Sequence, residues 1–169
     1  MVVSARGFTL IELLVVFSIV IILSTGSIVA YNSYNSSQKL AISAKQFMTV
    51  LQKAKFQAQN QVLPTLPSPS VCDKLLGYEV RVCTKASPLC VTSGTDYEID
   101  VVCESGTYAV DSYVLPSEVS VDSLRTNTGN IQFHLLTAGV SGSGSVVFML
   151  TSDKEKTVTI NSQGVIQFY

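Results

Sequence analysis

The sequence predicts an α+β fold in which one long N-terminal helix packs on an antiparallel β-sheet or a small β-sandwich. Two observations lead to this prediction. Apolar residues follow a helical repeat in the first third of the chain, and later they alternate with polar residues, as in half-buried strands. Short strands that follow one another without intervening helices favour antiparallel pairing over βαβ units.

Residues 1–7 are a short leader, made positive by Arg6 and the α-amino group, which favours a cytoplasmic N-terminus. Residues 8–31 begin with an apolar run that ends at Leu23 and is interrupted only by Thr9, Glu12 and Ser18. A helix over residues 8–31 would be about 36 Å long, enough to cross a bilayer core. We therefore expect a membrane-spanning helix there.

Residues 32–63 are expected to continue this helix in amphipathic form. One face collects Ala44, Phe47, Met48, Leu51, Ala54, Ala58 and Val62. Such a face normally packs on a sheet. The prolines from Pro64 to Pro69 are expected to end the helix, because proline lacks the N–H group and clashes with the preceding turn.

Residues 64–169 are expected to form a β-rich head. The predicted strands are Tyr78–Val82, Tyr97–Val101, Tyr108–Val114, Val119–Leu124, Ile131–Leu136, Val146–Leu150, Thr157–Ile160 and Val165–Phe168. The glycine-containing segment Thr137–Ser145 is predicted to be a loop, and Asn161–Gly164 the turn of a final hairpin.

The net charge of −1 conceals an asymmetry. Four lysines and no acid lie between Leu13 and Cys72, whereas eleven of the twelve acids lie from Asp73 onward. Either these are two solvated faces, or the basic helix of one copy complements the acidic head of another. Lysines spaced without aromatic residues between them are a poor nucleic-acid signal, so we expect no nucleic-acid partner.

The four cysteines are Cys72, Cys83, Cys90 and Cys103, without zinc-site spacing or a nearby histidine, so no metal or other cofactor is expected. Their even number behind an export-type N-terminus suggests two disulfides in an oxidising compartment. Three connectivities are open. If the strands around Val80 and Ile99 form a hairpin, the nested pairs Cys72–Cys103 and Cys83–Cys90 fit it.

Nothing in the sequence points to catalysis. The single histidine, His134, lies in an apolar strand pattern, where we expect it to face solvent or to make one hydrogen bond. The chain has no G-x-S-x-G elbow, phosphate-binding loop, dinucleotide fingerprint or H-E-x-x-H motif. We therefore expect no enzyme activity.

Glu12 needs an explanation, because a charge at the centre of a membrane helix costs about 2.5–3.5 kcal/mol. An ordinary signal peptide cleaved after Ala30, or a plain signal anchor, would leave this cost unexplained. A third interpretation has the helix leave the membrane and join identical helices. Glu12 would then pair with the free amino terminus of a neighbouring chain, which requires cleavage between Gly7 and Phe8.

The residues Gly7-Phe8-Thr9-Leu10-Ile11-Glu12 and the apolar run after them closely resemble the prepilin cleavage and methylation motif of type IV pilins and type II secretion pseudopilins. The resemblance implies the pilin fold and a prepilin peptidase that cuts between Gly7 and Phe8 and methylates the new amino group of Phe8. Glu12 matches the glutamate of this family that is thought to neutralise the N-terminus of an adjacent subunit during assembly.

A second resemblance covers the C-terminal part. Residues 131–139, 144–150 and 158–166 look like the tail of the GspH/FimT-like minor pseudopilins. Some features depart from the wider family: Val29 stands where many major pilins have proline, and the last cysteine, Cys103, lies far from the C-terminus. No acidic cluster has the spacing of a calcium loop.

These observations lead us to expect a structural subunit of a pilus-like or pseudopilus filament. It would be a single-pass precursor in the inner membrane with an exported head, and later part of a periplasmic or extracellular filament. The expected partners are the peptidase and methyltransferase, membrane lipid before assembly, copies of itself and other pilin-like subunits. The alternatives are a tip or priming subunit, a DNA-uptake pilin, or a secreted monomeric binding module.

Overall fold

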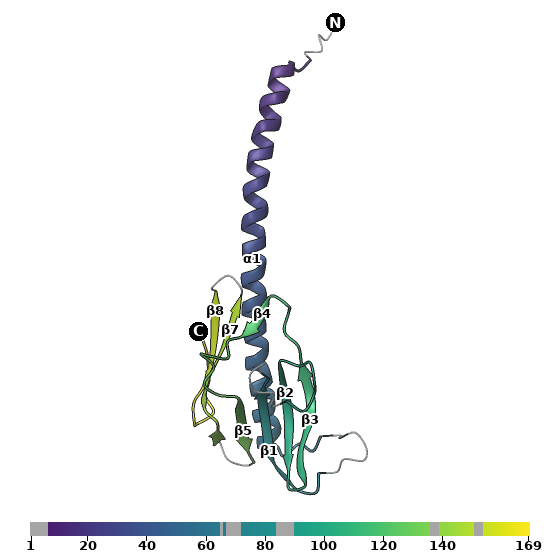
Figure 1. The fold of residues 1–169 in the computed structure, drawn as a ribbon, viewed down its shortest axis with the longest axis vertical. Helices are drawn as coiled ribbons and strands as arrows, with labels where there is room; N and C mark the ends of the chain where they lie inside the picture. Colours follow the sequence, from purple (N-terminus) through teal and green to yellow (C-terminus); the bar gives the residue numbers. More distant parts are fainter. Residues whose placement is uncertain (1–6, 65, 67–71, 84–89, 136–138, 151–153) are drawn as a thin grey trace, which may run out of the picture. The chain divides into compact units, whose positions relative to one another are not determined.

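In the part of the chain that it describes, the computed structural model has one helix followed by nine strands (Figure 1). It describes residues 7–64, 66, 72–83, 90–135, 139–150 and 154–169, without the side chains of 24–29. The chain divides into two compact units, Met1–Ser36 and Ser37–Tyr169, and each is described by itself.

The helix α1 spans Leu10–Gln59, whereas the sequence predicts it from Phe8 to Val62. Every large apolar side chain from Phe8 to Leu23 is exposed, with exposed fractions from 49% to 84%. Within the described residues, no helical stretch combines the length and the hydropathy needed to span a membrane. The membrane-spanning role of residues 8–31 therefore stays a prediction.

The C-terminal end of α1 is set by a backbone cap and lies before the prolines. Gln61 adopts a left-handed conformation, with a φ of 50°. Its N–H donates to the carbonyl of Ala58, and the N–H of Val62 donates to the carbonyl of Gln57, at 3.3 and 3.1 Å. This pair of bonds is a Schellman motif. The expectation that Pro64 ends the helix is therefore wrong, because the chain has already turned at Gln61.

The α1 residues of the second unit bury the face that the sequence predicts. The buried side chains are Leu40, Ser43, Ala44, Phe47, Val50, Leu51, Ala54 and Ala58. Val62 is the exception at 39% exposed, because it lies beyond the helix end. The helical repeat therefore identified the packing face but extended it one turn too far.

A five-stranded sheet, here the first sheet, has the order β3-β2-β1-β5-β6 and is antiparallel throughout. Its strands are β1 Leu75–Val82, β2 Tyr97–Cys103, β3 Gly106–Tyr113, β5 Asn130–His134 and β6 Val140–Ser141. The predicted hairpin is present, with Val80 opposite Ile99. The short strand β6 was not predicted and lies in the expected loop Thr137–Ser145, of which residues 137–138 are outside the described residues.

A four-stranded antiparallel sheet, here the second sheet, has the order β4-β7-β8-β9. Its strands are β4 Val119–Val121, β7 Gly144–Leu150, β8 Glu155–Ile160 and β9 Ile166–Phe168. The predicted turn of the final hairpin is present, with Gly164 at a φ of 73°. The strand predicted to reach Leu124 stops at Val121, because the Asp122 carboxylate accepts the N–H groups of Leu124 and Arg125 and turns the chain.

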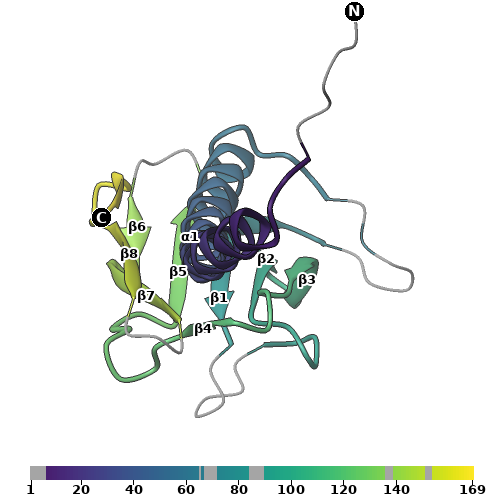
Figure 2. The ribbon, with the colours of Figure 1, turned by 90° about the horizontal axis from the view of Figure 1, so that it is seen from above.

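Phe47 of α1 contacts both sheets. Its ring lies 5.2 Å from the ring of Tyr97 on β2, edge to face, and 5.3 Å from the ring of Phe148 on β7. Figure 2 shows strands of both sheets around the helix, with β7 and β8 on one side of it and β2 and β3 on the other. Phe47 is 1% exposed, so its side chain is part of the buried core of the second unit.

The helix lysines bind within their own chain. The Nζ atoms of Lys39 and Lys53 lie 2.7 Å from carboxylate oxygens of Glu118 and Asp111, and Lys55 donates to the carbonyl of Gly164 at 2.8 Å. Exposed ion pairs of this kind contribute about 1 kcal/mol or less. Two of the four helix lysines therefore pair with acids of their own chain.

Replacing Phe47 by alanine should lower the free energy of unfolding of the full chain in detergent micelles by about 3–5 kcal/mol, because it leaves a cavity between the two sheets. The matched control is Phe56→Ala on the same helix, where the side chain is 61% exposed. The control should change stability by only about 0.5 kcal/mol. Equal losses in denaturant unfolding would show that Phe47 does not join the sheets.

Candidate functional site

The predicted cleavage site lies just before the first residue of α1. The hydroxyl oxygen of Thr9 accepts the N–H of Glu12 at 3.3 Å, and the carbonyl of Thr9 accepts the N–H of Leu13 at 3.2 Å. Thr9 is therefore the N-cap of the helix. The peptide bond between Gly7 and Phe8 precedes this cap, so the hydrogen bonds of the helix do not protect it.

The fold gives no steric reason for glycine at position 7. A Cβ atom added to Gly7 would meet no atom within 4 Å. The next side chain, Phe8, is 79% exposed. Among the described residues, the packing therefore does not require a small residue at this position.

Glu12 is the third helical residue and lies in the first turn, where a carboxylate is favoured by the helix dipole. The spacing from Thr9 to Glu12 is that of a capping box. The interpretation of Glu12 from sequence considers only the cost of its charge in a membrane helix and misses this capping signal. No described residue forms an ion pair with the Glu12 carboxylate. The other hydroxyl in the run, that of Ser18, donates to the carbonyl of Leu14 at 2.8 Å and is satisfied within the helix.

A second polar group, here called the acidic cluster, consists of Glu79, Arg81, Glu98 and Asp100 on one face of β1 and β2. Glu79 lies opposite Asp100, and Arg81 opposite Glu98. The Nε atom of Arg81 lies 3.1 Å from Glu79 Oε1 and 3.0 Å from Asp100 Oδ2. Glu98 and Asp100 are fully buried, so the sequence prediction of a half-buried strand is wrong for β2.

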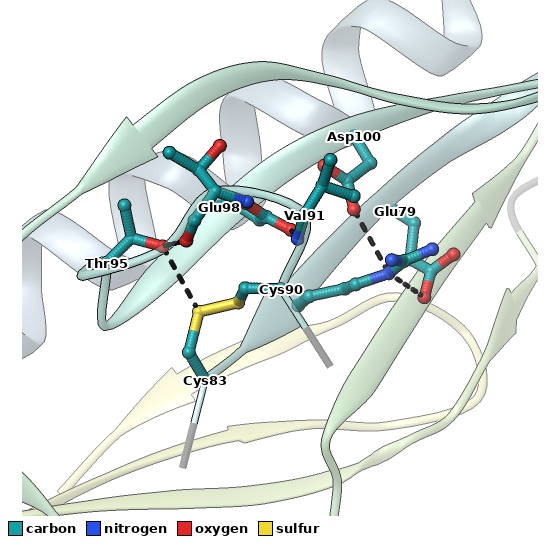
Figure 3. Close-up of polar contacts among 9 residues, drawn as sticks. Glu79, Cys83, Cys90, Val91, Thr95, Glu98 and Asp100 are labelled. Atoms are coloured by element: carbon teal, nitrogen blue, oxygen red, sulfur yellow. Dashed lines mark hydrogen bonds and ion pairs between the residues drawn. A yellow bond between two sulfur atoms is a disulfide. The ribbon is translucent and has the colours of Figure 1, made fainter. Parts of the chain in front are cut away.

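The segment that follows Cys90 explains how Glu98 can be buried. The two oxygens of the Glu98 carboxylate accept the N–H groups of Val91 and Thr92, at 2.6 and 3.1 Å (Figure 3). Cys90 is joined to Cys83, just after β1, by a disulfide with a Cα–Cα distance of 5.5 Å. The alternation of polar and apolar residues in the sequence does not indicate that this segment covers β2 through hydrogen bonds.

Asp100 is the electrostatically least favourable member of the cluster. Burial raises its pKa to about 7, and the neighbouring carboxylates of Glu98 and Glu79 act in the same direction against the attraction of Arg81. Neither of its carboxylate oxygens accepts a hydrogen bond from a described residue. Burial therefore outweighs the ion pair with Arg81.

The remaining predicted positions can also be located. The other disulfide joins Cys72 to Cys103 with a Cα–Cα distance of 5.4 Å, so the structure has the nested pairing of a single hairpin. His134 makes one short contact, with its Nε2 atom 2.7 Å from the hydroxyl of Ser141. In the described part of the chain, no group of three or more His, Cys, Asp or Glu side chains could hold a metal ion.

Comparison with known proteins places the recognisable part of the chain at its N-terminus. Residues 3–28 match the family model described as the prokaryotic N-terminal methylation motif. Searches of curated proteins and of solved structures found no match. The motif supports a precursor of the type IV pilin or pseudopilin kind, which implies processing by a prepilin peptidase and assembly into pilin-type filaments. The same motif suggests a membrane-anchored precursor and then a surface or periplasmic filament.

Asp100 should make the second unit less stable as the pH rises. Its pKa is about 7 in the folded chain against 3.8 for an ordinary aspartate, so its stabilising contribution is complete below pH 4 and is lost as the pH rises to 7. Asp100→Asn should therefore gain stability over the parent as the pH rises from 4 to 7, by about 1.4 kcal/mol for each pH unit between the two pKa values.

Denaturant unfolding across this pH range measures the difference between the two proteins, and an NMR titration of the Asp100 carboxyl gives its midpoint directly. Parallel stability curves for the parent and Asp100→Asn would contradict the prediction.

Proposed function

We propose that this chain is a non-enzymatic structural subunit of a type IV pilus-like or type II secretion pseudopilus filament, made as a membrane prepilin. A prepilin peptidase removes residues 1–7 and the new amino group of Phe8 is methylated. The observation that carries the proposal is the methylation motif over residues 3–28, with its cleavage bond outside the helix.

The exposed apolar surface of α1 supports a role in assembly. A helix that is apolar on all sides is stable only in lipid or among other helices. From Phe8 to Leu23 every large apolar side chain is exposed in the single chain. Lipid would cover this surface in the precursor, and the helices of neighbouring copies would cover it in the filament. Contacts that repeat from one copy to the next without closing produce a filament.

Glu12 supports the same role, because its carboxylate has no ion-pair partner among the described residues. Its N–H group is capped by Thr9. In an apolar bundle an uncompensated carboxylate is costly, whereas a pair with a neighbouring amino terminus removes the cost and fixes the register. We propose that the methylated amino group of Phe8 in the next copy is this partner.

The finer assignment is to the GspH/FimT-like minor pseudopilins. It rests on the pattern of residues 131–166, which in the fold supply most of β5, then β6, β7, β8 and the start of β9. A DNA-uptake role is less favoured, because Lys39 and Lys53 are paired with carboxylates of the same chain. A tip or priming position in the filament is compatible with the same processing.

Processing can be tested by sequencing the mature N-terminus after expression with a prepilin peptidase. The expected product begins with N-methylated Phe8. A mature chain that begins at Tyr31 would instead identify an ordinary signal peptide and overturn the proposal. Gly7→Leu provides a matched test: it should leave the thermal unfolding of the chain unchanged, since a Cβ atom added at Gly7 meets no described atom within 4 Å, but it should abolish cleavage.

Assembly can be tested with two substitutions of Glu12. Glu12→Gln keeps a side chain that suits a capping box but removes the charge, whereas Glu12→Ala removes both. Both variants should be cleaved and stable in the membrane, and neither should assemble. Ser18→Ala is the polar control and should assemble normally, because the Ser18 hydroxyl is satisfied within the helix.

Filament yield, measured by shearing and by electron microscopy, distinguishes the outcomes. Filaments from Glu12→Gln but not from Glu12→Ala would assign Glu12 to helix capping. Normal filaments from both variants would exclude the pairing role.

A further inference from the structure

We propose that the Cys83–Cys90 disulfide is a redox-sensitive clamp that holds the backbone of Val91 and Thr92 on the buried carboxylate of Glu98. When the disulfide is reduced, these two residues leave Glu98 and water reaches the acidic cluster, while the core of the second unit stays folded. This inference concerns the β1–β2 hairpin and does not depend on processing at Gly7.

The geometry links the disulfide directly to Glu98. The N–H of Cys83 donates to the carbonyl of Asp96 at 2.8 Å, so Cys83 is held at the base of the hairpin. The disulfide then fixes Cys90 beside Cys83, and the next two residues donate their N–H groups to Glu98. Figure 3 shows Cys83, Cys90, Val91 and Glu98 grouped together over β2.

The hydrogen bonds from Val91 and Thr92 matter because Glu98 is fully buried. A buried carboxylate without donors is strongly destabilising, whereas hydrogen bonds to a charged group are among the strongest in proteins. Arg81 directs its Nε atom at Glu79 and Asp100, and the hydrogen bonds found for the Glu98 carboxylate among the described residues come from Val91 and Thr92. Glu98 therefore depends on the two N–H groups that the disulfide positions.

The second disulfide has a different environment. Cys103 is 4% exposed and belongs to the hydrophobic core, and Cys72 packs against that core. Neither Cys83 nor Cys90 is a member of this core. Cys72, Cys83 and Cys90 are all partly exposed, so the two disulfides differ in that one of them contains the buried Cys103. Since thiol–disulfide exchange requires access to a sulfur atom, Cys83–Cys90 should open first.

The reaction partner is a dithiol reductant. Its thiolate attacks one sulfur of the pair and the S–S bond breaks through a mixed disulfide. The second thiolate of the reductant then releases the protein. Cys83 and Cys90 end as two thiols after gaining two electrons and two protons, and the reductant ends as a disulfide. Exchange with a disulfide oxidant, which takes up the two electrons and two protons and ends as a dithiol, reverses the step.

The test is amide hydrogen exchange on the full chain in detergent micelles, during titration with dithiothreitol. At concentrations where mass mapping finds Cys83–Cys90 open and Cys72–Cys103 closed, exchange at Val91 and Thr92 should rise about tenfold or more. Exchange at Val80 and Ile99, in the centre of the hairpin, should not change. Reoxidation should restore the original pattern.

Variants complete the test. Cys83→Ser/Cys90→Ser should reproduce the reduced pattern without a reductant. Glu98→Gln should raise exchange at Val91 and Thr92 in the oxidised protein, but should add nothing in the Cys83→Ser/Cys90→Ser background. The proposal is overturned if reduction leaves these amides protected, if Cys72–Cys103 opens first, if the whole unit unfolds, or if the two changes act independently.

Discussion

The packing of Phe47 against both sheets is the interaction on which the second unit depends. One ring on α1 contacts Tyr97 of the first sheet and Phe148 of the second, so neither sheet can bury its inner face without the helix. Small residues lie on the same face of the helix, and Ala44, Ala54 and Ala58 are fully buried there. They let the strands approach the helix closely, and this explains how a single helix can serve as the core of two sheets.

Hydrophobic periodicity predicted the parts of the fold that depend on burial. It gave the packing face of α1, the eight longer strands and the hairpin of β1 and β2, because each of these places apolar side chains at a regular interval. It failed to predict where α1 and β4 end, because backbone hydrogen bonds set these ends. The helix ends at a left-handed Gln61, and β4 ends where Asp122 binds two N–H groups, and neither event changes the apolar pattern.

The candidate sites also differ in whether the sequence could predict them. Gly7, Phe8 and Glu12 could be predicted from sequence because they lie in one continuous motif, and the family model matches residues 3–28. The acidic cluster could not, because its members come from two strands, and the segment that hydrogen-bonds to Glu98 does so through the backbone N–H groups of Val91 and Thr92. In sequence Glu98 looks like any outward-facing residue of a half-buried strand, and only the register of β1 and β2 shows that it shares a face with Arg81.

Glu12 lies in an apolar stretch of sequence and Glu98 in a buried position, and in apolar surroundings a carboxylate without a hydrogen-bond or ion-pair partner is destabilising. Glu98 is fully buried, and its own chain supplies two N–H donors through a covalently closed segment. Glu12 is surrounded in sequence by apolar residues, and its chain supplies a cap for its N–H group but, among the described residues, no ion pair for its carboxylate. Hydrogen bonds within the chain account for the burial of Glu98. For Glu12, no described residue supplies an ion pair, and this is why the proposed function assigns its partner to a neighbouring copy.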